Sequence, residues 1–107
     1  MRLAKACKER GIKKFTFTST CAVYGFHLDG IADETFPTNP QSDYAKSKLD
    51  VDIELQKMAD DKFCPVILRQ ATVFGFSPRM RWDIVINAFA MHVFKMGRLD
   101  IWFGGEA

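Results

Sequence analysis

Three side chains have the types and spacing for proton transfer at an alcohol, namely Thr20, Tyr44 and Lys48. Tyr44 and Lys48 stand four residues apart in the run YAKSK, so a helix would carry both on one face. The positive end of that helix dipole and the Lys48 ammonium both favour phenolate. We therefore expect the pKa of Tyr44 to lie below its usual value of about 10. Such a phenol can accept a proton from a hydroxyl near neutral pH.

Thr20 makes the Tyr–Lys pair a more specific indication of a catalytic site, because a predicted strand ends just before Thr20. Ligands bind at the carboxyl edge of open α/β sheets, so the Thr20 hydroxyl could hold a substrate oxygen against Tyr44. Each part also has a plain alternative. A YxxxK run occurs by chance on solvated helices, and a threonine after a strand can cap a turn. A strand followed by a hydroxyl and then by a YxxxK helix indicates a catalytic site more specifically than any of these features alone.

Six alternating elements must position these residues. Apolar periodicity and turn residues predict helices at 2–10, 43–60 and 83–96, and strands at 15–19, 65–69 and 99–103. Gly11 and Gly97 are expected to end helices, and Ser42 or Asp43 to cap the middle one. The alternation predicts an α/β fold with a mainly parallel sheet, in which 65–69 is a buried strand. Three strands are few for a doubly wound sheet, so we expect part of a larger fold.

Composition excludes several function classes. The chain has 107 residues, 48% of them hydrophobic, and a net charge of +2, which favours a folded domain without a nucleic-acid surface. No apolar run is long enough for a membrane span, and the N-terminus lacks the apolar centre of a signal peptide. Cys7, Cys21 and Cys64 form no CxxC pair, so we expect no metal site or disulfide and a cytoplasmic location. Cys21 is read as a small buried side chain, with a reactive thiol as the alternative.

Four runs of the sequence carry a family resemblance: FTSTCAVYG at 17–25, DETFP at 33–37, NPQSDYAKSKL at 39–49 and LRQATVFG at 68–75. Together they resemble the extended short-chain dehydrogenase/reductases, and within them the NAD-dependent epimerase/dehydratase branch of the UDP-glucose 4-epimerases. The resemblance implies a single partial domain at 1–107, a doubly wound Rossmann-like sheet without its N-terminal nucleotide-binding half. Residues 1–75 would be the C-terminal part of the NAD-binding domain, and 76–107 the start of the substrate-binding region.

The resemblance also implies the roles of the three catalytic candidates and the cofactor, NAD or NADP. Tyr44 would be the base, Thr20 would share the hydrogen bond of the developing oxyanion, and Lys48 would hold Tyr44 and the nicotinamide ribose. Ser19 also corresponds to a cofactor contact. The loop after the second predicted strand would offer backbone groups to the nicotinamide carboxamide through Gln70, Ala71 and Thr72.

Substrate binding is implied for Thr20, Thr72, Arg79 and Arg81. The two arginines stand where the family begins to contact its sugar nucleotide, and a guanidinium grips phosphate oxygens in a fork. Solvated loop cations are an equally good interpretation of them. Thr72 replaces the asparagine that is usual in the family, which leaves a reductase of a non-nucleotide alcohol or ketone as an alternative.

The residues after Thr20 distinguish two reactions. Dehydratases of the family carry Asp-Glu there, whereas this chain has Cys21 and Ala22. The acid and base for water elimination are therefore absent, and we predict an epimerase, which takes hydride from a sugar carbon and returns it to the other face. The family's Gly-rich GxxGxxG loop is not among these residues, so a cofactor-free interaction module is a further alternative.

The predicted helices are the candidate surfaces for contact with a partner chain. In the family, the helices that correspond to 2–10 and 43–60 pack into the four-helix bundle of a homodimer, so we expect a dimer here. Helix 83–96 is apolar nearly all round and is read as core or interface. Trp82, Trp102 and Phe94 are read as core residues.

Overall fold

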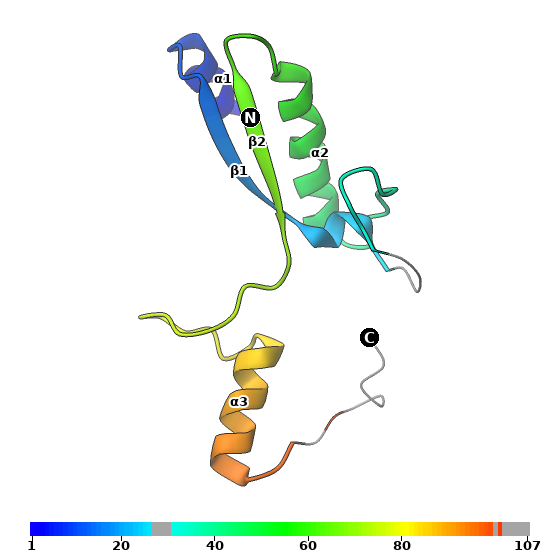
Figure 1. The fold of residues 1–107 in the computed structure, drawn as a ribbon, viewed down its shortest axis with the longest axis vertical. Coiled ribbons are helices and arrows are strands. Elements are labelled where there is room, and N and C mark those ends of the chain that lie inside the picture. Colours follow the sequence, from blue (N-terminus) through cyan, green and yellow to red (C-terminus); the bar gives the residue numbers. More distant parts are fainter. Residues whose placement is uncertain (27–30, 100, 102–107) are drawn as a thin grey trace. The chain divides into compact units, whose positions relative to one another are not determined.

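The computed structural model describes residues 1–26, 31–99 and 101, and the chain forms two compact units, Met1–Ala71 and Thr72–Ala107 (Figure 1). The first unit contains helix α1 (Arg2–Glu9), strand β1 (Lys14–Thr20), the 3-10 helix η1 (Cys21–Tyr24), helix α2 (Asp43–Met58) and strand β2 (Cys64–Gln70). The second contains helix α3 (Val85–Met96). The division falls between Ala71 and Thr72.

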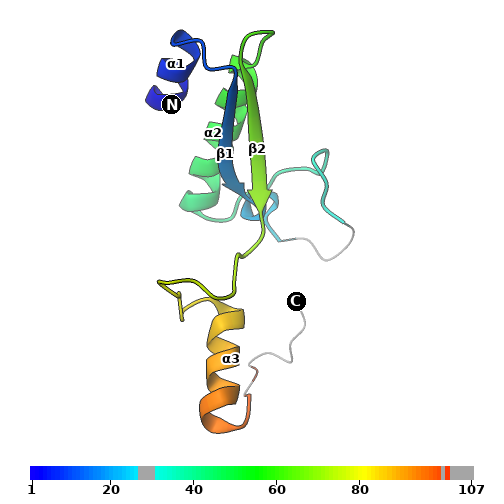
Figure 2. The same ribbon diagram turned by 60° about the vertical axis from the view of Figure 1, so that its left-hand side comes forward.

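The two strands confirm the predicted parallel pairing. β1 and β2 run side by side in the same direction, from the pair Lys14–Cys64 to the pair Thr20–Gln70 (Figure 2). Alternating aromatic and hydroxyl residues give β1 its strand preference, and β2 contains the β-branched residues Val66 and Ile67. Because the strands are parallel and in register, their carboxyl ends lie next to each other.

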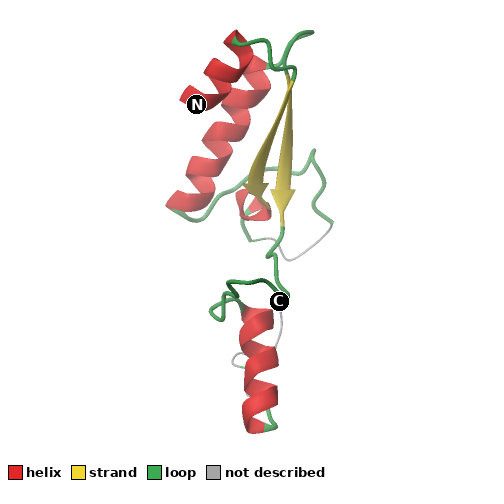
Figure 3. Cartoon of the chain, turned by 90° about the vertical axis from the view of Figure 1, so that its left-hand side faces the viewer, coloured by secondary structure: helices red, strands yellow, loops and turns green. Residues whose placement is uncertain are grey.

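Helices α1 and α2 cover the same face of this sheet (Figure 3). Ala4 of α1, Leu55 of α2 and Phe63 form the buried cluster of this layer, against which Phe15, Phe17 and Ile67 of the strands pack. The packing fixes one face of α2 against the sheet, and this helix carries the Tyr–Lys pair.

No described helix of the first unit covers the opposite face of the sheet, and here the prediction of a buried strand at 65–69 is wrong. Val66 and Leu68 of β2 are exposed, because the helices of the first unit's described part cover only the other face. Side chains alternate between the two faces of a strand, so covering one face buries only every second residue.

Local signals at the helix ends behave as expected. Gly11 (φ 73°) ends α1: its N–H donates to the Lys8 carbonyl, and the Ile12 N–H donates to the Cys7 carbonyl, the hydrogen-bond pattern of a Schellman motif. Ser42, rather than Asp43, caps α2, since its Oγ accepts from the Ala45 N–H at 3.1 Å.

The connection between η1 and α2 is anchored near its two ends. The Asn39 N–H donates to the Val23 carbonyl at 2.9 Å. Gly25 has a positive φ of 74°, and a Cβ at this position would overlap the Asn39 carbonyl oxygen. Only glycine fits this close backbone approach.

In the second unit, the described residues predicted to form a core are exposed, although the predicted helix end is correct. Gly97 ends α3 in the left-handed conformation, as expected. Trp82 and Phe94, predicted as core, are exposed, Phe94 to 90%. The described part of this unit contains one helix and no second layer to cover these rings. In the predicted strand 99–103, Leu99 and Ile101 lie outside any strand, while the rest, Trp102 included, lies outside the described residues. In the described residues, no helix has the length and apolarity to cross a membrane.

Candidate functional site

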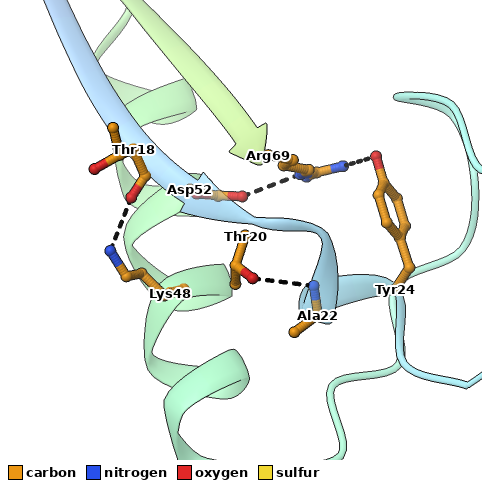
Figure 4. Close-up of polar contacts among 7 residues, drawn as sticks. All are labelled: Thr18, Thr20, Ala22, Tyr24, Lys48, Asp52 and Arg69. Carbon is orange, nitrogen blue, oxygen red and sulfur yellow. Dashed lines mark hydrogen bonds and ion pairs between the residues drawn. The ribbon is translucent and has the colours of Figure 1, made fainter. Parts of the chain in front are cut away.

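Lys48 ties α2 to the carboxyl end of β1. Its Nζ donates to the Thr18 carbonyl at 2.8 Å and lies 4.7 Å from the centre of the Phe17 ring (Figure 4). An ammonium has three hydrogens, so this contact leaves two for other acceptors. The long Lys48 side chain is thereby held at the strand end instead of being free in solvent.

Tyr44 lies one turn earlier on the same face of α2, as its spacing predicts. The centre of its ring is 5.8 Å from Lys48 Nζ, and the side chain is 58% exposed. The structure thus brings the phenol and the ammonium together and leaves the phenol accessible.

Thr20 is the last residue of β1, and its Oγ1 accepts from the Ala22 N–H at 3.2 Å. The hydroxyl therefore caps η1, which confirms the turn-capping interpretation. The same hydroxyl still has its hydrogen, because it acts here as an acceptor. Capping fixes its position two residues beyond the carbonyl that holds Lys48.

The cofactor candidates of the first unit are split between the two sides of the sheet. Gln70 is the pairing partner of Thr20 and is exposed at the end of β2, with Ala71 directly after it. Ser19 is buried, on the face that Phe17 also occupies. Its side chain thus points toward the helical layer, and its Oγ is a buried polar atom without a hydrogen-bond partner.

The substrate candidates Thr72, Arg79 and Arg81 all belong to the second unit. Arg79 and Arg81 line one pocket of about 250 Å³. Asn87 of α3 shapes the loop around this pocket: its Oδ1 accepts from the Gly75 N–H at 3.1 Å, and its Nδ2 donates to the Arg81 carbonyl at 3.0 Å. Asn87 was not identified from the sequence, although a polar residue in an apolar helix is a signal for it.

The two arginines differ in charge environment. The Arg81 Nε donates to Asp83 Oδ1 at 3.1 Å, and this hydrogen bond raises the pKa of Arg81 and lowers that of Asp83. Arg79 is exposed and forms no hydrogen bond or ion pair with the other described residues. Arg79 is therefore the more available cation for an anionic ligand.

A buried polar network also reaches the strand ends and was missed by sequence reasoning. Asp52 of α2 is 0% exposed and accepts from Arg69 Nε at 3.1 Å, while Arg69 Nη1 donates to the Tyr24 hydroxyl at 3.0 Å (Figure 4). Two signals could have found it. Asp52 stands four residues after Lys48, and Arg69 is a charge in an apolar strand, which needs a partner.

A second pocket, of about 400 Å³, lies in the first unit and is lined among others by Cys21, Tyr24, Asp33 and Arg69. Cys21 is exposed, so the expectation of a buried side chain is wrong: the residue begins η1 beyond the end of the strand. All three cysteines are free, and the described residues contain no group of three or more His, Cys, Asp or Glu that could hold a metal ion.

Comparisons with known proteins place these residues in context. The model of the NAD dependent epimerase/dehydratase family matches residues 1–107. The chain is 39% identical over 74 residues to dTDP-D-glucose 4,6-dehydratase of Mus musculus, covering 68% of the chain and 21% of that protein. It is 33% identical over 106 residues to YtcB of Bacillus subtilis (strain 168), described as an uncharacterized UDP-glucose epimerase, covering 98% and 33%.

Among solved structures, the chain resembles UDP-glucuronic acid 4-epimerase from Bacillus cereus in complex with NAD. The TM-score is 0.73 at 31% sequence identity, covering 87% of this chain and 30% of that one. The chain thus spans between 21% and 33% of the length of these three relatives.

Proposed function

Because the chain belongs to the NAD-dependent epimerase/dehydratase family, we propose that the protein containing it inverts a hydroxyl-bearing carbon of a nucleotide sugar. NAD, or NADP, would accept the hydride from that carbon and return it. The observation that carries the proposal is the placement of Lys48: its ammonium is bonded to β1 two residues before Thr20 and lies beside the Tyr44 ring.

Each of the three side chains has a role that its surroundings support. Tyr44 Oη takes the proton of the substrate hydroxyl and later returns it. Thr20 Oγ1 donates its remaining hydrogen to the same substrate oxygen. Lys48 uses its two remaining hydrogens to hold Tyr44 Oη and a ribose hydroxyl of the cofactor. These residues fit the cofactor, because Lys48 is fixed at the strand end and Tyr44 is exposed.

The remaining cofactor contacts are assigned to Ser19, Gln70, Ala71 and Thr72. Gln70 and Ala71 stand beside the end of β1, where they can offer backbone groups to a carboxamide. Ser19 would act through its backbone, since its side chain is buried on the other face.

Cys21 and Ala22 favour epimerisation over water elimination. Neither side chain is a carboxylic acid or carboxylate, and elimination needs an acid and a base beside Thr20. The names of the relatives include both dehydratases and epimerases, so this choice depends on the two residues.

Arg79 and Arg81 would bind the diphosphate of the nucleotide sugar. Both line one pocket, together with Gly75 and Ser77. Arg79 can bind directly, whereas Arg81 would share its guanidinium between Asp83 and the phosphate.

The test uses the longest natural polypeptide that contains these 107 residues. We expect Tyr44→Phe to lower turnover of a UDP-sugar by about 10²- to 10⁴-fold while NAD binding is retained. Lys48→Gln should weaken both turnover and NAD binding. Lys46→Gln, an exposed lysine two residues away on the same helix, is the matched control and should change neither. Unchanged turnover in Tyr44→Phe would overturn the proposal.

A homodimer through α1 and α2 is part of the same proposal. Leu3 of α1 is 69% exposed, and Ile53 of α2 is also exposed, as residues of a helical interface would be in a single copy. Sedimentation of the double variant Leu3→Glu/Ile53→Glu should show monomers. Ile31→Glu, an exposed isoleucine outside both helices, should leave the dimer intact.

The exposed Val66 and Leu68 favour a second candidate, a cofactor-free interaction module that uses their face of the sheet. Calorimetric titration with NAD separates the two: binding by the natural polypeptide excludes the module. Product analysis then separates an epimerase from a reductase, because a reductase consumes NADH with each turnover.

A further inference from the structure

The Asp52 carboxylate is buried in the layer between α2 and the sheet, one helical turn after Lys48. A carboxylate without water is costly unless it is paired and hydrogen-bonded. Arg69 meets this need at one of the two oxygens, since its Nε donates to Asp52 Oδ2 at 3.1 Å, while Oδ1 is buried without a hydrogen-bond partner. The partner comes from β2, so the contact joins the helix to the second strand.

A second nitrogen of the Arg69 guanidinium contacts a third element, η1. Nη1 donates to the Tyr24 hydroxyl at 3.0 Å, and the guanidinium carbon lies 5.1 Å from the centre of the Tyr24 ring. Burial acts to lower the pKa of Arg69, but the hydrogen bonds to Tyr24 and Asp52 outweigh it and the pKa is raised. The arginine is therefore held as a charged bridge between α2 and η1.

Each member of this network lies within four residues of a proposed site residue. Tyr24 ends η1, the short helix that the Thr20 hydroxyl caps. Arg69 directly precedes Gln70 at the end of β2. Asp52 shares a face of α2 with Lys48.

Two polar anchors therefore hold α2 against the sheet. Lys48 reaches the Thr18 carbonyl on β1, and Asp52 reaches Arg69 on β2. Apolar packing is not directional, whereas charged hydrogen bonds have defined geometry. Together the two anchors fix the rotation of the helix that carries the phenol.

We propose that Asp52, Arg69 and Tyr24 are positioning residues that set Tyr44, Lys48 and Thr20 in their working geometry. This inference rests on the proposed function. None of the three network residues needs to touch the substrate or cofactor. Their effect on catalysis comes from the placement of α2 and η1, where a misplacement of about 1 Å can cost about 10²-fold in rate.

The decisive variant replaces the ion pair with apolar side chains of similar size, Asp52→Leu/Arg69→Met, in the longest natural polypeptide. Such replacements often leave stability unchanged, because no charge remains buried without a partner. We expect a thermal midpoint close to wild type, a fall in kcat of about tenfold to hundredfold, and little change in KM. Hydrogen exchange at the α2 amides should become faster. Wild-type kcat in this variant would overturn the inference.

Tyr24→Phe tests the same idea if the double variant does not fold. It removes one hydroxyl and keeps the ring, and kcat should fall severalfold at unchanged KM. The matched control is Glu54→Gln, which changes a neighbouring α2 carboxylate paired with Lys57 at 3.0 Å at the surface. Glu54→Gln should leave kcat unchanged.

Tyr44→Phe measured alongside separates the two proposals. If Tyr44→Phe keeps full turnover, the proposed function fails. If Tyr44→Phe abolishes turnover while the network variants keep wild-type kcat, the positioning role alone fails.

Discussion

The two units of this chain hold their polar residues in different ways. In the first unit, the side-chain hydrogen bonds of Lys48 and Arg69 join distant parts of the sequence: Lys48 to Thr18 spans 30 residues, and Arg69 to Tyr24 spans 45. In the described part of the second unit, the side-chain hydrogen bonds of Asn87 and Arg81 are more local: Asn87 reaches 12 residues back to Gly75, and Arg81 pairs with Asp83 two residues away.

Because of this difference, the side-chain geometry of the first unit depends on the folded core more than that of the second unit does. Distant groups meet only after the chain has lost the entropy of the loop between them, so the proposed catalytic residues depend on the folded core. A pair two residues apart also forms in an unfolded chain. Substitutions in the first unit should therefore affect stability more strongly, and the predictions below test this in order of decreasing effect.

The largest effect is expected for Gly25→Ala in the first unit. Its φ of 74° and ψ of −153° are nearly restricted to glycine, and the added Cβ would overlap the Asn39 carbonyl oxygen. We expect a loss of about 4 kcal/mol in the free energy of unfolding, measured in urea. Gly11→Ala is the control, because Gly11 has nearly the same φ of 73° but open space around it. It should cost about 1 kcal/mol. Equal losses would contradict the role of the contact.

Leu55→Ala should follow. Leu55 is fully buried in the cluster beneath the sheet, so its truncation leaves a cavity and should cost about 3 kcal/mol. Phe94→Ala in the second unit removes a larger side chain, but that ring is exposed, and the change should lie within about 0.5 kcal/mol. Thermal unfolding of both variants measures the two losses of stability. A greater loss from Phe94→Ala than from Leu55→Ala would contradict the expected difference between the units.

Asn87→Ala should act within the second unit alone. The substitution leaves the Gly75 N–H and the Arg81 carbonyl without their side-chain partner, at a cost of about 2 kcal/mol. Limited proteolysis should cut the loop at 73–84 faster, while hydrogen exchange at β1 and β2 stays unchanged. Faster exchange in the strands would show that the units are coupled.

The smallest effect concerns pH. A hydrogen bond from Lys8 lowers the pKa of Asp60, and the pair joins α1 to the segment that follows α2 at 2.6 Å. Since the folded pKa is depressed, the stabilisation is present above the unfolded value of about 4 and is lost as the pH falls through the folded value. The urea midpoint of Asp60→Asn should fall less between pH 7 and pH 2 than that of wild type.

Asp83→Asn is the control for this titration. The hydrogen bond from Arg81 also lowers the pKa of Asp83, but a pair two residues apart persists in the unfolded chain. The pH dependence of its urea midpoint should match wild type. An equal change in both variants would contradict the distinction between local and distant pairs.

The sequence by itself determined the helices, the two described strands and the shared face of Tyr44 and Lys48. Gly11, Ser42 and Gly97 mark helix ends through conformational freedom or a side-chain cap, and these signals act over a few residues. The sequence also placed the candidate hydroxyl of Thr20 at the end of a strand. Such features follow from local geometry, so a short window of sequence contains them.

Only the tertiary structure decided which side chains are buried and which charges meet. Val66 and Leu68 look like core residues but lie on the sheet face that no described helix of the first unit covers, whereas Asp52 looks like a surface residue and is buried beside Arg69. The contact of Lys48 with the Thr18 carbonyl was equally hidden. Burial depends on the layers that surround a residue, and those layers come from segments far away in the chain.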